Sequence, residues 1–513
     1  MTSPFSTGAT PQRARPYALI VIVFIVIEAT GIFEQLMVYV ALPTLERVLD
    51  IDIAAVSWTI TVFLLVGAGT VALVGRLGDV YGRRRMLVIL LVLSIAGSAV
   101  SAALGSYEGI LIGRALQGTS AAVFPLLVGI AREAVPAPRV PVLVSLTTGT
   151  ALIAGSLGAL LAGVLLGLGQ WRLIFVASGI LSIVALLLTI FILPRSVVAP
   201  REKTRLDVVG AVLLAPAVAA VLFGIDTGSG AGWRSPLAVG LIVLGVVLIA
   251  VWIVVELRIT SPMFDLRIFR DPALTMTLVA TALIGLGVFA AGSLLNPILM
   301  QSPTSLPVGL GLTPTVAALY GLIVGAVGFV LSPVAGRIAA RRGAKVTLSI
   351  GVVLAIVGFI GFAIGVHNLP VAILATVFTG VGSAFILAGL PNLIVEVVPP
   401  HNTGEAVGII YGVGRTLFEA VGTALVGLLL ASSVVPQTTA PTRAAWNIVI
   451  VFIVVASAIA LIIALLIRKA KPMDQRGEVV EAVAEVTQDP TTGPERNRGA
   501  ATNRLGKPAV PGQ

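Results

Sequence analysis

The stretch GRLGDVYGRRRM, Gly75 to Met86, decides the fold of this chain. It follows a long apolar run and places one aspartate and four arginines within twelve residues. Such a stretch is typical of a short polar connection between two apolar helices, because arginines hold it at the membrane surface. A weaker copy, GRIAARRGA, begins at Gly336, 261 residues later and again after an apolar run. In this copy Ala340 stands where Asp79 stands in the first.

The composition predicts a membrane protein with many spans. Hydrophobic residues make up 57% of the 513 residues and charged residues only 11%, with a mean hydropathy of +1.07. A soluble domain has too little interior to bury so many apolar side chains. The formal net charge of +10 comes from basic residues placed between apolar runs, so it favours membrane topology over nucleic-acid binding.

Several classes of chemistry are disfavoured by the residue types. The chain has no cysteine and only two histidines, so disulfides, thiolate chemistry and His- or Cys-based metal sites are not expected. The sequence has no GxxxxGK[ST] phosphate loop and no pattern of nucleophile, base and oxyanion hole. We therefore expect a protein that is not an enzyme, binds no cofactor and takes its energy from an ion gradient.

The apolar runs predict an all-helical, polytopic membrane fold. A helix needs about 20 apolar residues to cross a bilayer. By this rule the sequence predicts fourteen spans: 17–42, 55–75, 86–104, 109–130, 141–166, 172–193, 207–225, 237–256, 272–300, 312–335, 345–366, 370–395, 405–432 and 445–467. The first is expected to be a retained helix, because it is longer than a signal peptide and has no A-x-A cleavage site.

The predicted domains follow from the repeat. They are a cytosolic segment over 1–16, a six-helix bundle over 17–193, a linker with two additional spans over 194–271, a second six-helix bundle over 272–467, and a disordered cytosolic tail over 468–513. An even number of spans puts both termini on one side, and the arginine-rich connections assign that side to the cytosol of the plasma (cell inner) membrane. Two parallel copies of one bundle are a transporter architecture, with the site near the midplane between them.

The first copy of the repeat, GxLxDxxGRR after the second span, resembles the signature loop of the major facilitator superfamily. In that family the loop latches one bundle against the other, which implies gating roles for Gly75, Asp79, Gly82 and Arg83. We expect both glycines to form a tight turn, and Asp79 to accept hydrogen bonds or to lie at a helix N-terminus. The alternative is an ordinary arginine-rich hairpin.

Other segments resemble the fourteen-span drug/proton antiporter branch of this superfamily. FEQLMVYVALP, Phe33 to Pro43, is similar to the pattern of its first helix and puts Glu34 where the branch has an aspartate. RALQG, Arg114 to Gly118, is similar to a motif of its fourth helix, and WRLIF, Trp171 to Phe175, to the start of its sixth. AGSLGALLAG, Ala154 to Gly163, lacks the proline of the antiporter motif in its fifth helix.

Five ionisable side chains are expected inside the spans: Glu28, Glu34, Arg114, Arg415 and Glu419. Each costs about 2.5 to 3.5 kcal/mol on insertion scales, so each needs a partner, an aqueous cavity or a function. A Glu34 that alternates between a dry pocket and Arg114 would take up and release a proton, so these two are the predicted proton-coupling pair. The alternatives are a fixed interhelical hydrogen bond for Glu34 and a structural pin for Arg114.

The other polar residues of the spans receive structural or cavity roles. Glu28 lies about 120° round its helix from Glu34, and a structural role is predicted for it. Arg415 and Glu419, four residues apart, are predicted to pair with each other. The predicted substrate cavity is lined by Gln35, Tyr39, Gln117, Asn296 and Tyr320, each of which is also compatible with simple packing.

Together with the resemblance, these features predict a monomeric secondary transporter that exports small lipophilic or cationic compounds in exchange for protons. Its expected partners are the small-molecule substrate, protons and the lipid bilayer. One alternative keeps the fold and makes the protein a proton-coupled symporter or a lipid or metabolite exporter. Another makes it a membrane scaffold or sensor that acts through its tail.

Overall fold

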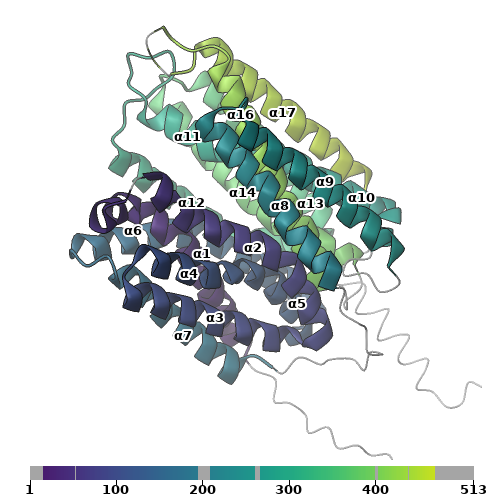
Figure 1. Cartoon of the computed structure of the whole chain (residues 1–513). Coiled ribbons are helices and arrows are strands. Elements are labelled where there is room, and N and C mark those ends of the chain that lie inside the picture. Colours follow the sequence, from purple (N-terminus) through teal and green to yellow (C-terminus); the bar gives the residue numbers. More distant parts are fainter. Residues whose placement is uncertain are drawn as a thin grey trace, which may run out of the picture.

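The computed structural model describes residues 16–51, 53–194, 208–259, 266–398, 403–436, 438 and 440–467. This part of the chain is built of long helices joined by short connections (Figure 1). Helices are expected, because a span within hydrocarbon must satisfy its own backbone hydrogen bonds. The predicted cytosolic segment, apart from Pro16, and the tail after residue 467 lie outside the described residues.

The N-terminal bundle holds six spans in seven helices and two short 3-10 turns. The helices are α1 (Tyr17–Leu49), α2 (Ile53–Tyr81), α3 (Arg83–Leu104), α4 (Tyr107–Gly118), α5 (Val123–Ala134), α6 (Val140–Gly167) and α7 (Leu173–Ile192), with turns η1 (Thr119–Ala122) and η2 (Ala137–Arg139). The span predicted over 109–130 is α4, η1 and α5 in sequence. Pro125 accounts for the tightened turn, because proline has no N–H to donate to the preceding turn of the helix.

The C-terminal bundle begins at residue 272 and contains two π-helical segments. Its elements are α10 (Pro272–Ile284), η4 (Gly285–Phe289), α11 (Ala290–Gln301), α12 (Pro314–Arg342), α13 (Ala344–Ile364), α14 (Leu369–Val397), α15 (Thr403–Ala406), η6 (Val407–Gly414), α16 (Arg415–Ala431) and α17 (Arg443–Leu466). The π-helical segments are η4 and η6, and the first packs against α16. Wide turns of this kind occur often at functional sites.

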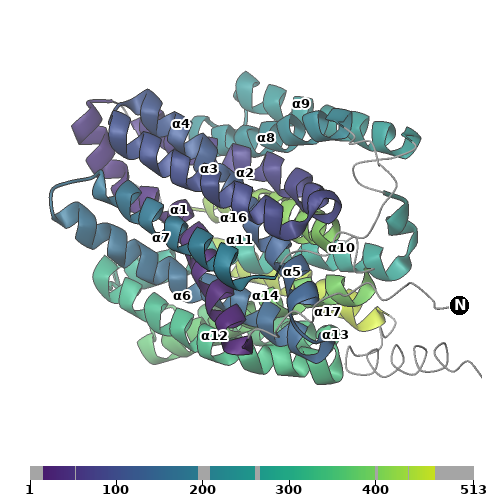
Figure 2. The ribbon, with the colours of Figure 1, turned by 90° about the horizontal axis from the view of Figure 1, so that it is seen from below.

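Between the bundles the chain forms α8 (Val208–Ala231), α9 (Pro236–Arg258) and the 3-10 turn η3 (Leu266–Arg270). Seen from below, α8 and α9 lie together at one edge of the molecule, alongside α2 (Figure 2). The rings of Trp58 on α2 and Phe223 on α8 are 4.9 Å apart. Because α8 also contacts α16, the inserted pair touches both bundles on one side.

The number of spans shown is smaller than the fourteen predicted. Twelve helices among the described residues are long and apolar enough to cross a membrane, and α2, bent by 43°, makes thirteen. The remaining predicted span, 207–225, falls on α8, whose described apolar part, Pro216–Ile225, is shorter than a span requires. The count of fourteen therefore stays a prediction.

The two bundles meet along α6 and α12. A Cβ atom on Gly325 would lie 2.7 Å from the carbonyl oxygen of Leu152, and one on Gly336 would lie 2.6 Å from the Cα of Val142. Only glycine permits backbones to approach so closely. Since position 336 faces 142 and position 325 faces 152, the two helices run in opposite directions along this seam.

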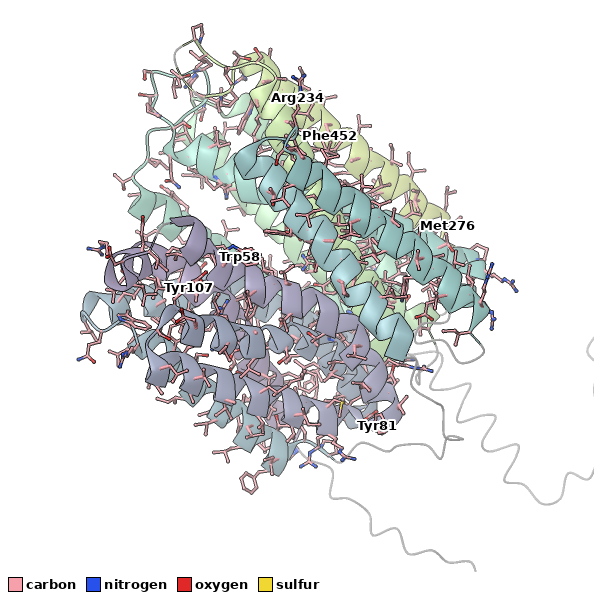
Figure 3. The ribbon with its side chains drawn as sticks, in the orientation of Figure 1. Trp58, Tyr81, Tyr107, Arg234, Met276 and Phe452 are labelled. Atoms are coloured by element: carbon pink, nitrogen blue, oxygen red, sulfur yellow. The ribbon has the colours of Figure 1, made fainter. Side chains whose placement is uncertain are left out.

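The rest of the interface between the bundles is concentrated at one end of the molecule. This end carries Arg83–Arg85, Arg341 and Arg342 and is called the arginine-rich end below. Here α2 meets α15 and η6 of the other bundle. Toward the opposite end the bundles diverge (Figure 1). Tyr81 lies at the arginine-rich end, and Trp58 and Tyr107 lie near the opposite one (Figure 3).

Candidate functional site

The connection between α2 and α3 is a single glycine. Gly82 has φ 99° and ψ 123°, a conformation that L side chains rarely adopt, and it separates two helices with no loop between them. The prediction that Gly75 also forms the turn is wrong, because Gly75 lies within α2, six residues before its end. Its backbone lies at the contact with the other bundle: a Cβ on Gly404 of α15 would lie 2.9 Å from the carbonyl oxygen of Gly75.

Asp79 and Arg83 form a buried ion pair at this turn. Arg83 donates from Nε and Nη2 to Asp79 Oδ1, at 2.9 Å and 2.6 Å, and from Nη1 to Glu133 Oε1 at 2.7 Å. The side chain of Asp79 is fully buried. Its Oδ1 atom would be 3.0 Å from a Cβ on Gly404, so the carboxylate lies beside the first turn of α15. Helix N-termini carry a partial positive charge, which attracts a carboxylate at this place.

Arg83 bonds only within the N-terminal bundle in the contacts given above, whereas Arg132 joins the two bundles at the same end. Arg132, in the last turn of α5, donates to the carbonyl oxygen of Val398 at 3.1 Å and to the hydroxyl of Thr403. Both acceptors belong to the C-terminal bundle. The name gate latch is used below for Asp79, Arg83, Arg132, Thr403 and Gly404.

The second copy of the repeat has the same turn without the latch. Gly343 has φ 93° and ψ 150°, close to the conformation of Gly82, and separates α12 from α13. Ala340 stands in place of the aspartate. The N-terminus of α13 is capped by Glu396, whose Oε1 accepts a hydrogen bond from the backbone N–H of Ala344 at 2.7 Å. The turn at Gly82 is therefore held by an ion pair, and the turn at Gly343 by a carboxylate cap.

Glu34 lies in the interior of the N-terminal bundle. It is fully buried, and its Oε1 accepts hydrogen bonds from Ser94, from Ser182 at 2.9 Å and from Ser178 at 3.2 Å. These serines lie on α3 and α7. Hydrogen bonds to a charged group contribute roughly 1.5 to 3 kcal/mol each, so the three hydroxyls stabilise the ionised carboxylate strongly.

Arg114 completes this cluster from α4. Its guanidinium is fully buried and donates to the carbonyl oxygens of Glu34 and Thr59, at 2.7 Å and 3.1 Å, and it lies 4.1 Å from the ring centre of Phe63. It binds the backbone of Glu34 and not its carboxylate, although its charge still attracts that carboxylate. The arginine thus pins α1 and α2 to α4, as the structural alternative holds, and the proton-coupling role of the pair stays a prediction.

Gln117 belongs to the same network and does not line a cavity. The side chain is fully buried, accepts from Arg114 at 3.1 Å, and donates to Ser98 at 2.9 Å and to Ser178 at 3.2 Å. The side chain does not line a cavity in the described arrangement, because it is fully buried among these partners, and its role in substrate binding stays a prediction. Sequence reasoning missed the serines, although Ser94 and Ser98, like Ser178 and Ser182, repeat at a spacing of four on otherwise apolar helices.

The other predicted cavity residues lie nearer the end where the bundles diverge. Gln35, Asn296 and Tyr320 are half-buried, and Tyr39 is 45% exposed. Gln35 and Tyr39 lie in the second half of α1. Asn296 lies in the second half of α11, and Tyr320 lies in the first two turns of α12. The structure thus leaves these four side chains partly accessible on three helices from both bundles.

Arg415 and Glu419 form the predicted pair on α16. Arg415 Nη1 and Glu419 Oε2 are 2.9 Å apart, and the guanidinium lies 5.3 Å from the ring centre of Phe289 and 5.2 Å from that of Tyr411. The two rings come from the π-helical segments η4 and η6. This pairing neutralises the arginine charge and holds it between two aromatic side chains.

Two bundles of membrane-spanning helices, joined at one end by a polar latch and parted at the other, define a membrane transporter. The model of the Major Facilitator Superfamily matches residues 21–214 and 277–493, and the chain belongs to this superfamily. The stretch between the two matched parts contains α9 and most of α8, from residue 215 on, which supports their description as an inserted pair.

Known relatives share about a quarter of their residues with this chain. It is 26% identical over 402 residues to the multidrug resistance protein Stp of Mycobacterium tuberculosis (strain CDC 1551 / Oshkosh), covering 78% of this chain and 73% of that protein. It is 27% identical over 440 residues to the tetracenomycin C resistance and export protein of Streptomyces glaucescens, covering 83% and 78%. It is 29% identical over 387 residues to the uridine/deoxyuridine transporter of Lactococcus lactis subsp. cremoris (strain MG1363), covering 72% and 78%.

Among solved structures, the human organic anion transporter MFSD10 (TETRAN) is similar in fold, with a TM-score of 0.60 at 15% identity. The match covers 88% of this chain and all of that one. The chain is therefore a transporter of small molecules with the fold of its superfamily.

Proposed function

We propose that this protein is a proton-driven exporter of small lipophilic or cationic compounds, of the fourteen-span antiporter branch, with α8 as the fourteenth span. The observation that carries the proposal is the uneven contact between the bundles, which are latched at the arginine-rich end and diverge at the other. A transporter of this architecture works by rocking its bundles about a central site, so that one end closes as the other opens. The relatives named for multidrug resistance and tetracenomycin export support export as the direction.

The arginines favour one orientation in the membrane. By the positive-inside rule the arginine-rich end faces the cytosol, together with both termini. In that orientation the gate latch closes the cytosolic side, and the described arrangement is the one open to the outside of the plasma (inner) membrane. The protein would work there as a monomer, surrounded by lipid.

A proton gradient supplies enough energy without a cofactor. One proton moving inward gains about 2.3 kcal/mol per 100 mV of membrane potential and about 1.4 kcal/mol per pH unit. The sum of about 3.7 kcal/mol supports a substrate gradient of a few hundredfold.

The test is flux in proteoliposomes under an imposed pH step. Purified protein is reconstituted, and uptake of ethidium, tetraphenylphosphonium and uridine is followed with the interior acid, with the exterior acid, and with an uncoupler added. Antiport predicts accumulation of ethidium or tetraphenylphosphonium only when the interior is acid, and its loss with the uncoupler. Accumulation that ignores the pH step, or no uptake of either cation, would contradict the proposal.

A symporter or metabolite carrier of the same fold is the second candidate. Two observations favour it: the helix α6 lacks the proline of the antiporter motif, and one relative is named as a uridine/deoxyuridine transporter. In the same vesicles a symporter would accumulate uridine when the exterior is acid. The direction of the effective pH step therefore distinguishes the two.

A further inference from the structure

The helix α1 carries a second buried carboxyl group with very different surroundings. Glu28 is only 9% exposed, and the structure gives it no hydrogen bond and no ion pair with any described residue. It shares one face of α1 with Gln35 and Tyr39, which follow at spacings of seven and eleven, near two and three full turns. Exposure rises along this face from Glu28 to Tyr39, so Glu28 lies at its closed end.

Across this face lies the C-terminal bundle. Glu28 is close enough to the phenol of Tyr411 for an electrostatic interaction between them. The ring of Tyr411 packs against Phe124 of the N-terminal bundle, with ring centres 5.0 Å apart, and the guanidinium of Arg415 lies 5.2 Å from the centre of the Tyr411 ring. Glu28 therefore lies where the two bundles touch, whereas every partner of Glu34 belongs to one bundle.

This difference decides which carboxyl group can sense the position of the bundles. A proton shifts a conformational equilibrium only if the group binds it with different affinity in the two conformations. When the bundles move as bodies, Glu34 keeps its three serines and Arg114, because they move with it. The surroundings of Glu28 change, because Tyr411 and its neighbours move relative to α1.

The charges around Glu34 and Glu28 also favour Glu28 as the group that binds the proton. Glu34 with Arg114 is a neutral combination, and a proton added there would leave a buried positive charge. Arg415 already pairs with Glu419, and among the described residues no ion pair with Glu28 compensates its charge when it is ionised. An uncompensated buried carboxylate is costly, and binding a proton removes that cost.

The charged and titratable groups near Glu28 are few. From the C-terminal bundle, Tyr411 of η6 interacts electrostatically with Glu28, and Arg415 and Glu419 of α16 interact in turn with Tyr411. Of the helices packed on α1, α6 and α7 carry no charged or titratable side chain. The remaining groups lie at helix ends or in the cluster described above: Arg76, Asp79 and Tyr81 on α2, Arg132 and Glu133 on α5, and Tyr107, Glu108 and Arg114 on α4.

We propose that Glu28, and not Glu34, is the carboxyl group whose protonation is coupled to the movement of the bundles. In the described arrangement it takes up a proton, which becomes bound to a carboxyl oxygen and cancels its charge at the interface. When the bundles separate at the arginine-rich end, water reaches Glu28 and the proton leaves to water on that side. The assignment rests on the proposed proton-driven function and names the residue that couples it.

The test measures how pH moves the bundles, so it needs no substrate. The chain has no cysteine, so spin labels can be placed at Leu168→Cys and Val434→Cys, which are 65% and 43% exposed after α6 and α16. Distances between the labels are measured by pulsed electron paramagnetic resonance in proteoliposomes from about pH 5 to about pH 8.5, a range that brackets titration of buried carboxyl groups. Each variant is compared with the double-cysteine parent, and thermal unfolding checks its fold.

The parent should change the ratio of its two distance populations about 5- to 150-fold over this range, the size of a typical coupling. Glu28→Gln should abolish the change, Glu28→Asp should retain it, and Glu34→Gln should retain it as the matched variant on the same helix. The assignment of Glu28 would be overturned if Glu28→Gln kept the pH response, or if Glu34→Gln lost it while Glu28→Gln kept it. Either result would leave the proposed proton coupling intact. A parent whose distances ignore pH would overturn proton coupling itself.

Discussion

Replacing Gly404 by alanine should weaken closure at the arginine-rich end. The added Cβ would lie 2.9 Å from the carbonyl oxygen of Gly75 and 3.0 Å from Oδ1 of Asp79, both on the other bundle. Ordinary contact begins at 3.4 Å, so α15 and α2 must move apart by several tenths of an ångström. Overpacking of this kind costs about 1 to 3 kcal/mol, and only while the two bundles touch.

That cost translates into a shift between conformations. A difference of about 1.4 kcal/mol is tenfold in an equilibrium constant, so Gly404→Ala should raise the population that is open at this end roughly 5- to 150-fold. The assay is labelling of a single thiol at Val71→Cys by a water-soluble maleimide, since Val71 is 6% exposed and lies against Gly412 of the other bundle. Labelling should speed up by the same factor.

The matched control is Gly427→Ala, which changes the same residue type in α16, where no atom lies within 4 Å of the added Cβ. It should leave the labelling rate of Val71→Cys unchanged. Equal rates for Gly404→Ala and the parent, or an equal increase for Gly427→Ala, would refute the reasoning.

Three further changes test the packing and charges of the N-terminal bundle by thermal unfolding of the purified protein. Arg114→Met should destabilise it by about 3 to 5 kcal/mol, because it leaves the buried carboxylate of Glu34 without its counter-charge, and Glu34→Gln in the same chain should recover part of the loss. Ser182→Ala should cost about 1.5 to 3 kcal/mol by removing one hydrogen bond to that carboxylate, and an unchanged midpoint would show that the bond is not made. Gly97→Ala should lower the stability by about 1 to 3 kcal/mol, because the added Cβ would lie 2.5 Å from the backbone of α4. The control Gly163→Ala should leave the stability unchanged, because no atom lies within 4 Å of its added Cβ.

The features that depend on local spacing could be predicted from the sequence. The helical spans follow from the length of the apolar runs, and the sharp turn at Gly82 follows from the residues around it. The pairing of Arg415 with Glu419 follows from a spacing of four, because such residues are neighbours on one face of a helix. The structure shows all of these, except that it shows twelve or thirteen spans and not fourteen.

The direction in which a buried polar residue points could not be predicted. A helix in the middle of a bundle is apolar on nearly all faces, so the sequence does not distinguish the face toward its own bundle from the face toward the other. Glu34 and Gln117 point into their own bundle, where they form hydrogen bonds with serines of α3 and α7. Glu28 interacts electrostatically with Tyr411 of the other bundle, although the sequence suggested only a structural role. Gly75 was placed in a turn because glycine permits turns, but it lies in a helix.

The inserted pair makes the two long sides of the transporter unequal toward the bilayer. On one side, α8 bridges α2 and α16 and separates the line between them from lipid. On the other side, the backbones of α6 and α12 approach each other closely through glycines, and α14 packs against both of these helices. The two long sides therefore present different surfaces to the surrounding bilayer, one covered by the inserted pair and the other formed by the glycine-lined contact of α6 and α12.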